Sequence, residues 1–343
     1  MLTDLGKRAK TAARQLARAA TDSKNQALLS LAGRLWASRA DLLSANARDV
    51  SSGIAAGLTP ALIDRLTLTE PRLTSIIADL RRVAELPDPV GEKFDATTLP
   101  DGLRLHKQRV PLGVLGVIYE SRPNVTIDVA GLAIKTGNAA ILRGGKETLN
   151  SNRVLVGAAQ NALSENGLPP DAIQFIDDPD RARVLELLTL YDYVDLIIPR
   201  GGNALHEFCR QHSKIPVMTG GIGICHLFVD ESADLDRAYA VIHNAKTQRP
   251  TVCNALDTVL VQRAVADQFL PELVRALARA GVTFRAHENA LPYLYQHYTG
   301  AYLKRDPETG EEQLKYAKNI GKRLPESVTP AGPDDFDTEW LSL

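Results

Sequence analysis

The sequence is poor in the features that mark disulfide-rich, metal-binding and membrane proteins. Only three of its 343 residues are cysteine, and no CxxC pair is present. Three cysteines cannot form a disulfide framework, and without a CxxC pair we expect no metal site, so a reducing compartment, the cytoplasm, is predicted. No apolar run approaches the length needed to cross a bilayer, and no membrane association is expected.

Charge of either sign is not in excess. The chain has 40 Lys and Arg residues against 41 Asp and Glu residues, for a net charge of -1. This balance provides no basic surface, so no nucleic-acid partner is expected. The Arg- and Lys-rich start is interrupted by Asp4 and Asp22, which favours a solvated amphipathic helix over an organelle transit peptide. With 44% hydrophobic residues the composition is globular, and the length allows two domains.

Apolar strands alternate with amphipathic helices from residue 114 onward. Strands that are apolar on both faces and alternate with helices indicate a parallel sheet covered on both sides. Such sheets bind ligands beyond the carboxyl ends of their strands, so functional residues are expected in the loops there. The predicted strands are 114–119, 139–142, 173–176 and 194–198, and the predicted helices are 125–135, 151–165, 181–188 and 202–212.

Three other segments complete the predicted organisation. A turn from Pro100 to Gly102 predicts a β-arm over 97–109 that pairs with another subunit. After Asp230 a second α/β unit is predicted, with helices over 235–244 and 266–280 and a strand over 258–262. Residues 293–333 are rich in charge and are predicted to form a surface excursion.

Two of the loops at the strand ends carry polar candidates. In YESRPN, after the first strand, the Asn124 amide lies near a helix start and can donate to an oxyanion. Taken alone, its position favours an N-cap by about two to one. In ILRGGKE, after the second strand, Arg143 and Lys146 bracket two glycines and suit a phosphate, although a solvated turn weighs equally.

A third loop carries a weaker signal. In IIPRGGNALHEF, Gly201 and Gly202 open a helix whose first N–H groups favour an anion. A Gly-Gly turn is common, and no GxGxxG sequence follows a strand. A dinucleotide site would therefore have to be built without the usual Rossmann fingerprint.

One cysteine stands apart from the other two. Cys253 lies in NAKTQRPTVCNALDT among polar and small residues, whereas structural cysteines usually have apolar neighbours. Lys246 and Arg249 upstream are cations that favour the nucleophilic thiolate. Taken alone, a passive half-buried cysteine is the commoner case, and Cys209 and Cys225, with apolar or helical neighbours, fit that description.

Together these residues resemble the aldehyde dehydrogenase superfamily, and within it the branch of reductases that act on glutamyl phosphate. The most specific strings are VPLGVLGVIYESRPNVTIDVAGLAIKTGNAAILRGGKE and NAKTQRPTVCNALDT, and the resemblance runs to about Leu291 and resumes at FDTEWLSL. It implies an α/β fold with two parallel-sheet domains and a β-arm for oligomerisation. We expect a dinucleotide-binding domain over 1–229 with its arm at about 95–110, a catalytic domain over 230–333, and a return segment over 334–343.

The resemblance implies catalytic and substrate-binding roles for several residues. Cys253 matches the family's nucleophile, and Asn124 matches the asparagine that forms the oxyanion hole with the backbone N–H of that cysteine. Arg122 and Arg249 are candidates for binding the phosphate or carboxylate of the substrate. In hydrolytic relatives a water-activating glutamate stands where this chain has Met218, so hydrolysis of a thioester is not expected.

The cofactor-binding residues are also implied by the resemblance. Arg143 matches a lysine that contacts the adenosine ribose, and Gly201-Gly202 matches the helix start near the dinucleotide. Glu339 matches a glutamate that binds the nicotinamide ribose. Lys146 stands where NAD-preferring relatives have a carboxylate, and this reversal of charge predicts NADPH and NADP as the cofactor pair.

The expected reaction is NADPH-dependent reduction of L-glutamyl 5-phosphate to L-glutamate 5-semialdehyde, with release of phosphate through a thioester on Cys253. This is the second step of proline biosynthesis from glutamate. A homo-oligomer is expected, with the upstream glutamate kinase as a further partner. Two alternatives stay open. One is a CoA-linked or hydrolytic dehydrogenase, against which ESRPN and KTQRP argue. The other is a dinucleotide-binding fragment without turnover, since the family continues after Glu339 and this chain stops at Leu343.

Overall fold

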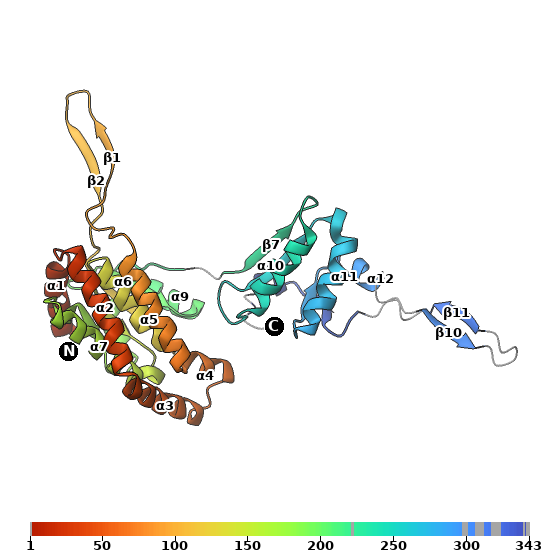
Figure 1. Ribbon diagram of the computed structural model, residues 1–343, viewed down its shortest axis with the longest axis horizontal. Helices are drawn as coiled ribbons and strands as arrows, with labels where there is room; N and C mark the ends of the chain where they lie inside the picture. Colours follow the sequence, from red (N-terminus) through yellow and green to blue (C-terminus); the bar gives the residue numbers. More distant parts are fainter. Residues whose placement is uncertain are drawn as a thin grey trace. The chain divides into compact units, whose positions relative to one another are not determined.

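The chain divides into two compact units, Met1–Gly221 and Ile222–Leu343 (Figure 1). The computed structural model describes residues 2–220, 223–296, 301–305, 312–316, 324–338 and 340. The boundary lies earlier than the one expected between residues 229 and 230. Strand β7 (Cys225–Val229) pairs in parallel with β8 (Leu256–Val261), and this pairing places β7 in the second unit.

The first unit is built on a four-stranded parallel sheet in the order β5-β4-β3-β6. Its strands are β3 (Val114–Tyr119), β4 (Ala139–Arg143), β5 (Ile173–Phe175) and β6 (Leu196–Arg200). Strands β3 and β4 are buried at every position, which confirms the predicted parallel sheet covered on both faces. The strand order reverses direction at β3, so the topological switch point lies between β3 and β6.

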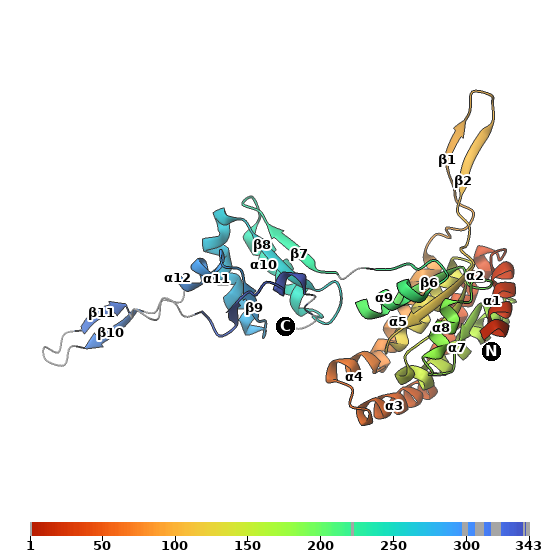
Figure 2. The same cartoon turned by 180° about the vertical axis from the view of Figure 1, so that it is seen from behind.

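Helices cover this sheet in layers. They are α1 (Leu2–Leu16), α2 (Thr21–Ala37), α3 (Arg39–Ala55), α4 (Pro60–Leu66), α5 (Glu70–Glu85), α6 (Pro123–Lys135), α7 (Leu149–Glu165), α8 (Ala182–Leu188) and α9 (Asn203–His212). Helices α6 and α7 connect β3 to β5 and pack against α2, which also contacts α5 (Figure 1). Helix α8 connects β5 to β6 in the opposite direction and contacts α9 (Figure 2). Right-handed crossovers therefore place α8 on the other face of the sheet.

Helix α5 shows how the sequence specifies these elements. The Thr69 side chain accepts a hydrogen bond from the N–H of Arg72, and a proline follows in the first turn, where its missing N–H costs nothing. Leu73, Ile77 and Leu80 recur at helical spacing and are buried. The cap and the apolar stripe together set where α5 begins and which face it turns to the core.

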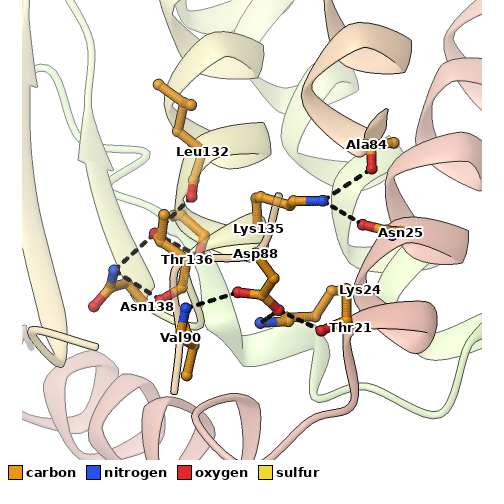
Figure 3. A network of polar contacts seen from close by, with 11 residues as sticks. Thr21, Lys24, Asn25, Ala84, Asp88, Val90, Leu132, Lys135, Thr136 and Asn138 are labelled. Atoms are coloured by element: carbon orange, nitrogen blue, oxygen red, sulfur yellow. Dashed lines mark hydrogen bonds and ion pairs between the residues drawn. The ribbon is translucent and has the colours of Figure 1, made fainter. Parts of the chain in front are cut away.

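A buried ion pair fixes the segment between α5 and the arm (Figure 3). Lys24 Nζ lies 2.6 Å from Asp88 Oδ2, which also accepts a hydrogen bond from Thr21 Oγ1. The other carboxylate oxygen of Asp88 accepts from the N–H of Val90. Burial raises the pKa of Asp88, but the bonds from Lys24, Thr21 and Val90 outweigh burial and hold it below its ordinary value.

A second lysine, Lys135, lies beside this pair, and its ammonium donates to neutral oxygens. Lys135 Nζ donates to Asn25 Oδ1 at 2.7 Å and to the carbonyl oxygen of Ala84 at 2.9 Å (Figure 3). Burial lowers the pKa of Lys135 below its ordinary value. The two lysines thus join α2, the end of α5 and the end of α6 at the base of the arm.

The predicted arm is an antiparallel hairpin in the first unit. Strand β1 (Lys93–Thr98) pairs with β2 (Arg104–Gln108), and every residue of both strands except Phe94 is exposed (Figure 1). Gly102 has φ +89° at the predicted turn, a conformation that favours glycine. Pairing of the arm with another subunit stays a prediction.

Among its described residues, the second unit contains helices and short strand pairs, two of them parallel and one antiparallel. Its elements are β7, β8, α10 (Leu235–Thr247), α11 (Arg263–Arg279), β9 (Phe284–Ala286), α12 (Leu291–Gln296), β10 (Ala301–Arg305), β11 (Glu312–Tyr316), β12 (Val328–Pro330) and a 3-10 turn, η4 (Asp335–Asp337). Phe269, Leu273 and Leu277 of α11 are buried in the core that includes β7 and β8.

The segment expected to be a surface excursion contributes to this unit's core. Val328 in β12 is 4% exposed and packs in one apolar cluster with Val274, Ala286 and Leu294. Strand β12 also pairs in parallel with β9. The expectation of a surface segment over 293–333 is therefore wrong for Leu294 and Val328, because apolar residues scattered among charges still meet the core.

Within the described ranges, no helix is long and apolar enough to cross a membrane. The same ranges contain no group of three His, Cys, Asp or Glu side chains placed to hold a metal ion.

Candidate active site

The three cysteines occupy three different environments. Cys209 in α9 is fully buried, and burial raises the pKa of its thiol to about 11. Cys225 at the start of β7 is partly buried, and Cys253, in the loop between α10 and β8, is exposed. Of the three, Cys253 is the thiol most open to a substrate, as the sequence predicts.

The backbone of Cys253 contacts the chain that enters β7. Cys225 Sγ lies 3.4 Å from the carbonyl oxygen of Cys253, and the N–H of Cys225 donates to Asp257 Oδ2 at 3.3 Å. The other oxygen of the Asp257 carboxylate accepts from the N–H of Trp340 at 3.0 Å. One carboxylate in β8 therefore holds both the start of β7 and the residue that follows Glu339.

The structure gives Lys246 a different role from the predicted one. Lys246 is buried in α10, its Nζ donates to the carbonyl oxygen of Trp340 at 3.2 Å, and burial lowers its pKa. This hydrogen bond joins Lys246 to the backbone of Trp340 rather than to the loop that carries the thiol. Arg249, the second predicted cation, is exposed four residues before Cys253. Glu339 lies outside the described residues.

Asn124 lies in the first turn of α6 and does not cap it. The N-cap position is Arg122, and the Asn124 amide donates from Nδ2 to Asp128 Oδ2 at 3.1 Å. The N-cap alternative for Asn124 is therefore wrong. The Asn124 amide is partly buried at the end of β3, and its partner Asp128 is exposed.

The loop after β4 carries two cations, one buried at the edge of the sheet and one exposed to solvent. Arg143 is largely buried, and its two terminal nitrogens donate to the carbonyl oxygens of Gly144 and Pro179 at 2.9 and 3.0 Å. Its Nε is buried without a hydrogen-bond partner among the described residues, and burial lowers the pKa of the guanidinium. Lys146 begins a 3-10 turn and is exposed.

A buried network beneath this loop escaped the sequence-based prediction. Tyr119 Oη lies 2.8 Å from Thr126 Oγ1, which donates to Asn152 Oδ1 at 2.6 Å. Asn152 in turn donates to Thr148 Oγ1 at 2.9 Å, and Thr148 donates to the carbonyl oxygen of Gly145. These side chains come from β3, α6 and α7, so the loop carrying Arg143 and Lys146 is fixed from below.

The helix start at Gly201-Gly202 already has an anion next to it. The N–H of Gly202 donates to Glu120 Oε1 at 3.2 Å, and a Cβ on Gly201 would lie 2.6 Å from that oxygen. Ser121, the next residue, donates to Glu147 Oε2 at 3.2 Å. The loop after β3 is therefore bonded to the loop after β4 and to the loop after β6.

The first unit thus brings six predicted residues to one edge of its sheet. They are Arg122, Asn124, Arg143, Lys146, Gly201 and Gly202, which lie at or after the carboxyl ends of β3, β4 and β6. Cys253 and Arg249 belong to the second unit. That unit also contains a cavity of about 870 Å³ lined by Lys246, Asp257 and Trp340, and Cys253 is not among its lining residues.

Comparisons with known proteins agree with this architecture. The aldehyde dehydrogenase family model matches residues 4–290. A gamma-glutamyl phosphate reductase from Roseiflexus castenholzii is 59% identical over all of this chain and 76% of its own length, and one from Serratia marcescens is 51% identical over the same shares. The crystal structure of gamma-glutamyl phosphate reductase from Thermotoga maritima matches with a TM-score of 0.83 at 40% identity, covering all of this chain and 75% of that one.

The chain belongs to the gamma-glutamyl phosphate reductases of the aldehyde dehydrogenase family. It is therefore an oxidoreductase with an aldehyde dehydrogenase-like α/β fold, as predicted. Members of this family use a nicotinamide dinucleotide.

The edge of the first sheet fits such a cofactor in this reductase. The unpartnered Nε of Arg143 and the exposed ammonium of Lys146 provide positive charge beside a close backbone approach at Gly144-Gly145. The switch point between β3 and β6 is where open α/β sheets bind dinucleotides. Glu120 and Glu147 place two carboxylates at the same edge.

Sequence reasoning also missed the residues that hold the site together. Glu120 lies within YESRPN and Asp257 within NALDT, both strings singled out for their neighbours. Asp257 is an acidic residue in the otherwise apolar strand LDTVLV, which is a usable signal because an ionised group in a half-buried strand needs a partner. Glu120 follows a fully buried strand directly, where a side chain faces the ligand edge.

Proposed function

We propose that this reductase converts L-glutamyl 5-phosphate to L-glutamate 5-semialdehyde with NADPH, in the biosynthesis of proline. The observation that carries the proposal is the exposed thiol of Cys253. It lies within the string NAKTQRPTVCNALDT, in a chain 59% identical to a gamma-glutamyl phosphate reductase. The Cys253 thiolate attacks the acyl phosphate carbon, a C–S bond forms, and the C–O bond to phosphate breaks, leaving a thioester.

Asn124 and the backbone N–H of Cys253 are proposed to stabilise the oxyanion of each tetrahedral intermediate. An amide or backbone N–H aimed at a developing oxyanion contributes about 3–4 kcal/mol per donor in a dry site. Arg122 and Arg249, exposed guanidiniums of the first and second units, are proposed to bind the phosphate or carboxylate of the substrate. Met218 is exposed and has no basicity, so it cannot activate water against the thioester.

We propose that the dinucleotide, which supplies a hydride when bound, is held by Lys146, Arg143, the Gly201-Gly202 backbone and Glu339. Lys146 is proposed to select NADPH by contacting its 2′-phosphate, with Arg143 contributing through its unpartnered Nε. The reduced thioester carbon then bears a thiohemiacetal on Cys253. Its collapse releases the aldehyde and returns the thiolate.

The exposed arm supports a homo-oligomer, because an edge hairpin with exposed leucines at 99, 103 and 105 invites pairing with a second copy. We place this assembly in the cytoplasm, where thiols stay reduced. Transfer of the acyl phosphate from an upstream glutamate kinase is a further proposal.

The test is the reaction run backwards with glutamate semialdehyde, phosphate and NADP, followed by absorbance of the reduced cofactor. The proposal predicts turnover that requires phosphate and that disappears in Cys253→Ala while cofactor binding persists. Cofactor binding by the unaltered chain without any turnover would support the dinucleotide-binding alternative instead.

A further inference from the structure

Two residues that precede or begin β7 lie close to the carbonyl oxygen of Cys253. Cys225 Sγ lies 3.4 Å from it, and a Cβ built on Gly223 would lie 3.3 Å from the same atom. The chain entering β7 therefore packs directly on the peptide that follows the nucleophile. The lack of a side chain at Gly223 permits this approach, since a contact of 3.3 Å is tighter than most Cβ atoms accept.

Cys225 is fixed from its other side. Its N–H donates to Asp257 Oδ2, and the second oxygen of that carboxylate accepts from the N–H of Trp340. Asp257 lies in β8, four residues after Cys253 in the chain. The Asp257 carboxylate and the Cys225 thiol thus close a connection from the start of β8 back to the Cys253 carbonyl group.

The loop between these points has little regular structure of its own. The N–H of Val252 donates to the carbonyl oxygen of Arg249 at 3.3 Å, and that of Ala255 donates to Val252 at 3.0 Å. Residues 251–255 form turns rather than helix or strand. Short turns hold their peptides less firmly than helices do, so contacts from outside the loop determine how the Cys253 peptide faces.

We propose that Cys225 and Asp257 are positioning residues that set the backbone of the Cys253 loop. This rests on the proposed function of Cys253, whose N–H must face the oxygen and whose thiolate must face the carbon of one carbonyl group of the substrate. Cys225 does not touch the substrate in this account. Its S–H donates to the Cys253 carbonyl oxygen, and Asp257 holds Cys225 in reach of that oxygen.

The first experiment compares Cys225→Ala with Cys225→Ser in the full chain. A weak S–H hydrogen bond is expected to disfavour opening of the loop by a factor of about two to five. Amide exchange in the peptide covering 251–255 should therefore accelerate by about that factor in Cys225→Ala. The kcat should fall by a similar factor with KM unchanged. Cys225→Ser keeps a hydroxyl donor and should restore both, whereas a space-filling role for Cys225 predicts no rescue and would overturn the proposal.

The second experiment uses Asp257→Asn, which keeps the shape and removes one acceptor. An amide presents one oxygen and one NH₂ group, so it cannot accept from both Cys225 and Trp340. Asp257→Asn therefore loses one charge-assisted bond, so amide exchange in 251–255 should be about tenfold faster and kcat should again be lower. Asp230→Asn, at a partly buried carboxylate that bonds Ser232 within its own turn, is the matched control and should change neither measurement. Unchanged exchange in Asp257→Asn would contradict the proposal.

Amide exchange needs no substrate, so it separates this proposal from the assignment of the reaction. If the unaltered chain shows no reductase activity but the exchange pattern follows Cys225 and Asp257, the reaction is wrong and the positioning stands. If the reductase is active and exchange in 251–255 is indifferent to both variants, the positioning is wrong and the reaction stands.

Discussion

Glu120 Oε1 accepts a hydrogen bond from the backbone N–H of Gly202, with 3.2 Å between the two atoms. The bond joins the ends of β3 and β6 across the topological switch point of the first sheet. The positive end of α9 is therefore already matched by a carboxylate of the chain itself. A dinucleotide phosphate at that helix start would meet Glu120 as a competitor of like charge.

Replacing this carboxylate should tighten cofactor binding. In Glu120→Gln the competing charge is gone, and an anion at a helix N-terminus gains about 0.3–1 kcal/mol, or roughly two- to fivefold in Kd. Titration of protein fluorescence with NADPH measures the change, and Glu231→Gln, an exposed carboxylate of the second unit, is the control. Weaker NADPH binding in Glu120→Gln would show that Glu120 is a ligand of the cofactor rather than its competitor.

Lys146 should set the preference for NADPH over NADH. One charge-assisted bond to the 2′-phosphate contributes about 1.5–3 kcal/mol, or roughly one to two decades of preference. The ratio of kcat/KM for the two cofactors should therefore fall by that amount in Lys146→Glu and stay constant in Lys214→Glu, an exposed lysine after α9. An unaltered ratio in Lys146→Glu would mean that this loop does not read the 2′-phosphate.

The buried pair at the base of the arm should matter for stability and show a defined pH dependence. Lys24→Met removes one partner of a buried pair and is expected to lower the free energy of unfolding by about 3 kcal/mol at pH 7. Lys107→Met breaks the exposed pair with Asp95 and should cost less than about 1 kcal/mol.

The direction of this pH dependence follows from the lowered pKa of Asp88. Its contribution is present above the unfolded value near 3.8 and is lost as pH falls through the lower folded value. The difference between the unaltered protein and Lys24→Met in urea unfolding should therefore shrink below about pH 4. A difference that stays constant down to pH 3 would mean that the pair is not what Lys24→Met disrupts.

Because residue 218 is a methionine, we expect that the thioester is not hydrolysed. In hydrolytic relatives the equivalent position is a glutamate, and a thioether cannot accept a proton from water. Incubation with glutamate semialdehyde and NADP in the absence of phosphate should yield no free glutamate beyond a background without enzyme. Steady production of glutamate without phosphate would show that another group activates water.

The sheet of the first unit could be predicted because its strands are apolar on both faces. Residues 114–119 and 139–143 have no polar side chain before the last positions, and only a strand covered from both sides buries such a run. The exposure of Cys253 could also be predicted, because a thiol among polar residues has no packing reason to be there. Both signals are local, and a single sequence carries them.

The partners of the polar residues could not be predicted in the same way. Lys246 seemed suited to the thiolate but donates to the backbone of residue 340, and Asn124 seemed suited to an N-cap position that Arg122 occupies. Strand β7, which the structure groups with the second unit, was missed. In each case the outcome depends on which distant segment packs alongside, and neither spacing nor propensity contains that information.

The most direct test of the account is to trap the acyl group on Cys253. The chain is mixed with glutamate semialdehyde and NADP without phosphate and quenched rapidly in acid, and tryptic peptides are analysed by mass spectrometry. Arg237 and Lys246 lie between Cys225 and Cys253, so the two thiols fall in separate peptides. The account predicts one reduced cofactor per subunit in a burst, a glutamyl adduct on the Cys253 peptide, and disappearance of that adduct when phosphate is added. Phosphate-dependent turnover with no adduct on Cys253, or with the adduct on Cys225 or Cys209, would contradict it.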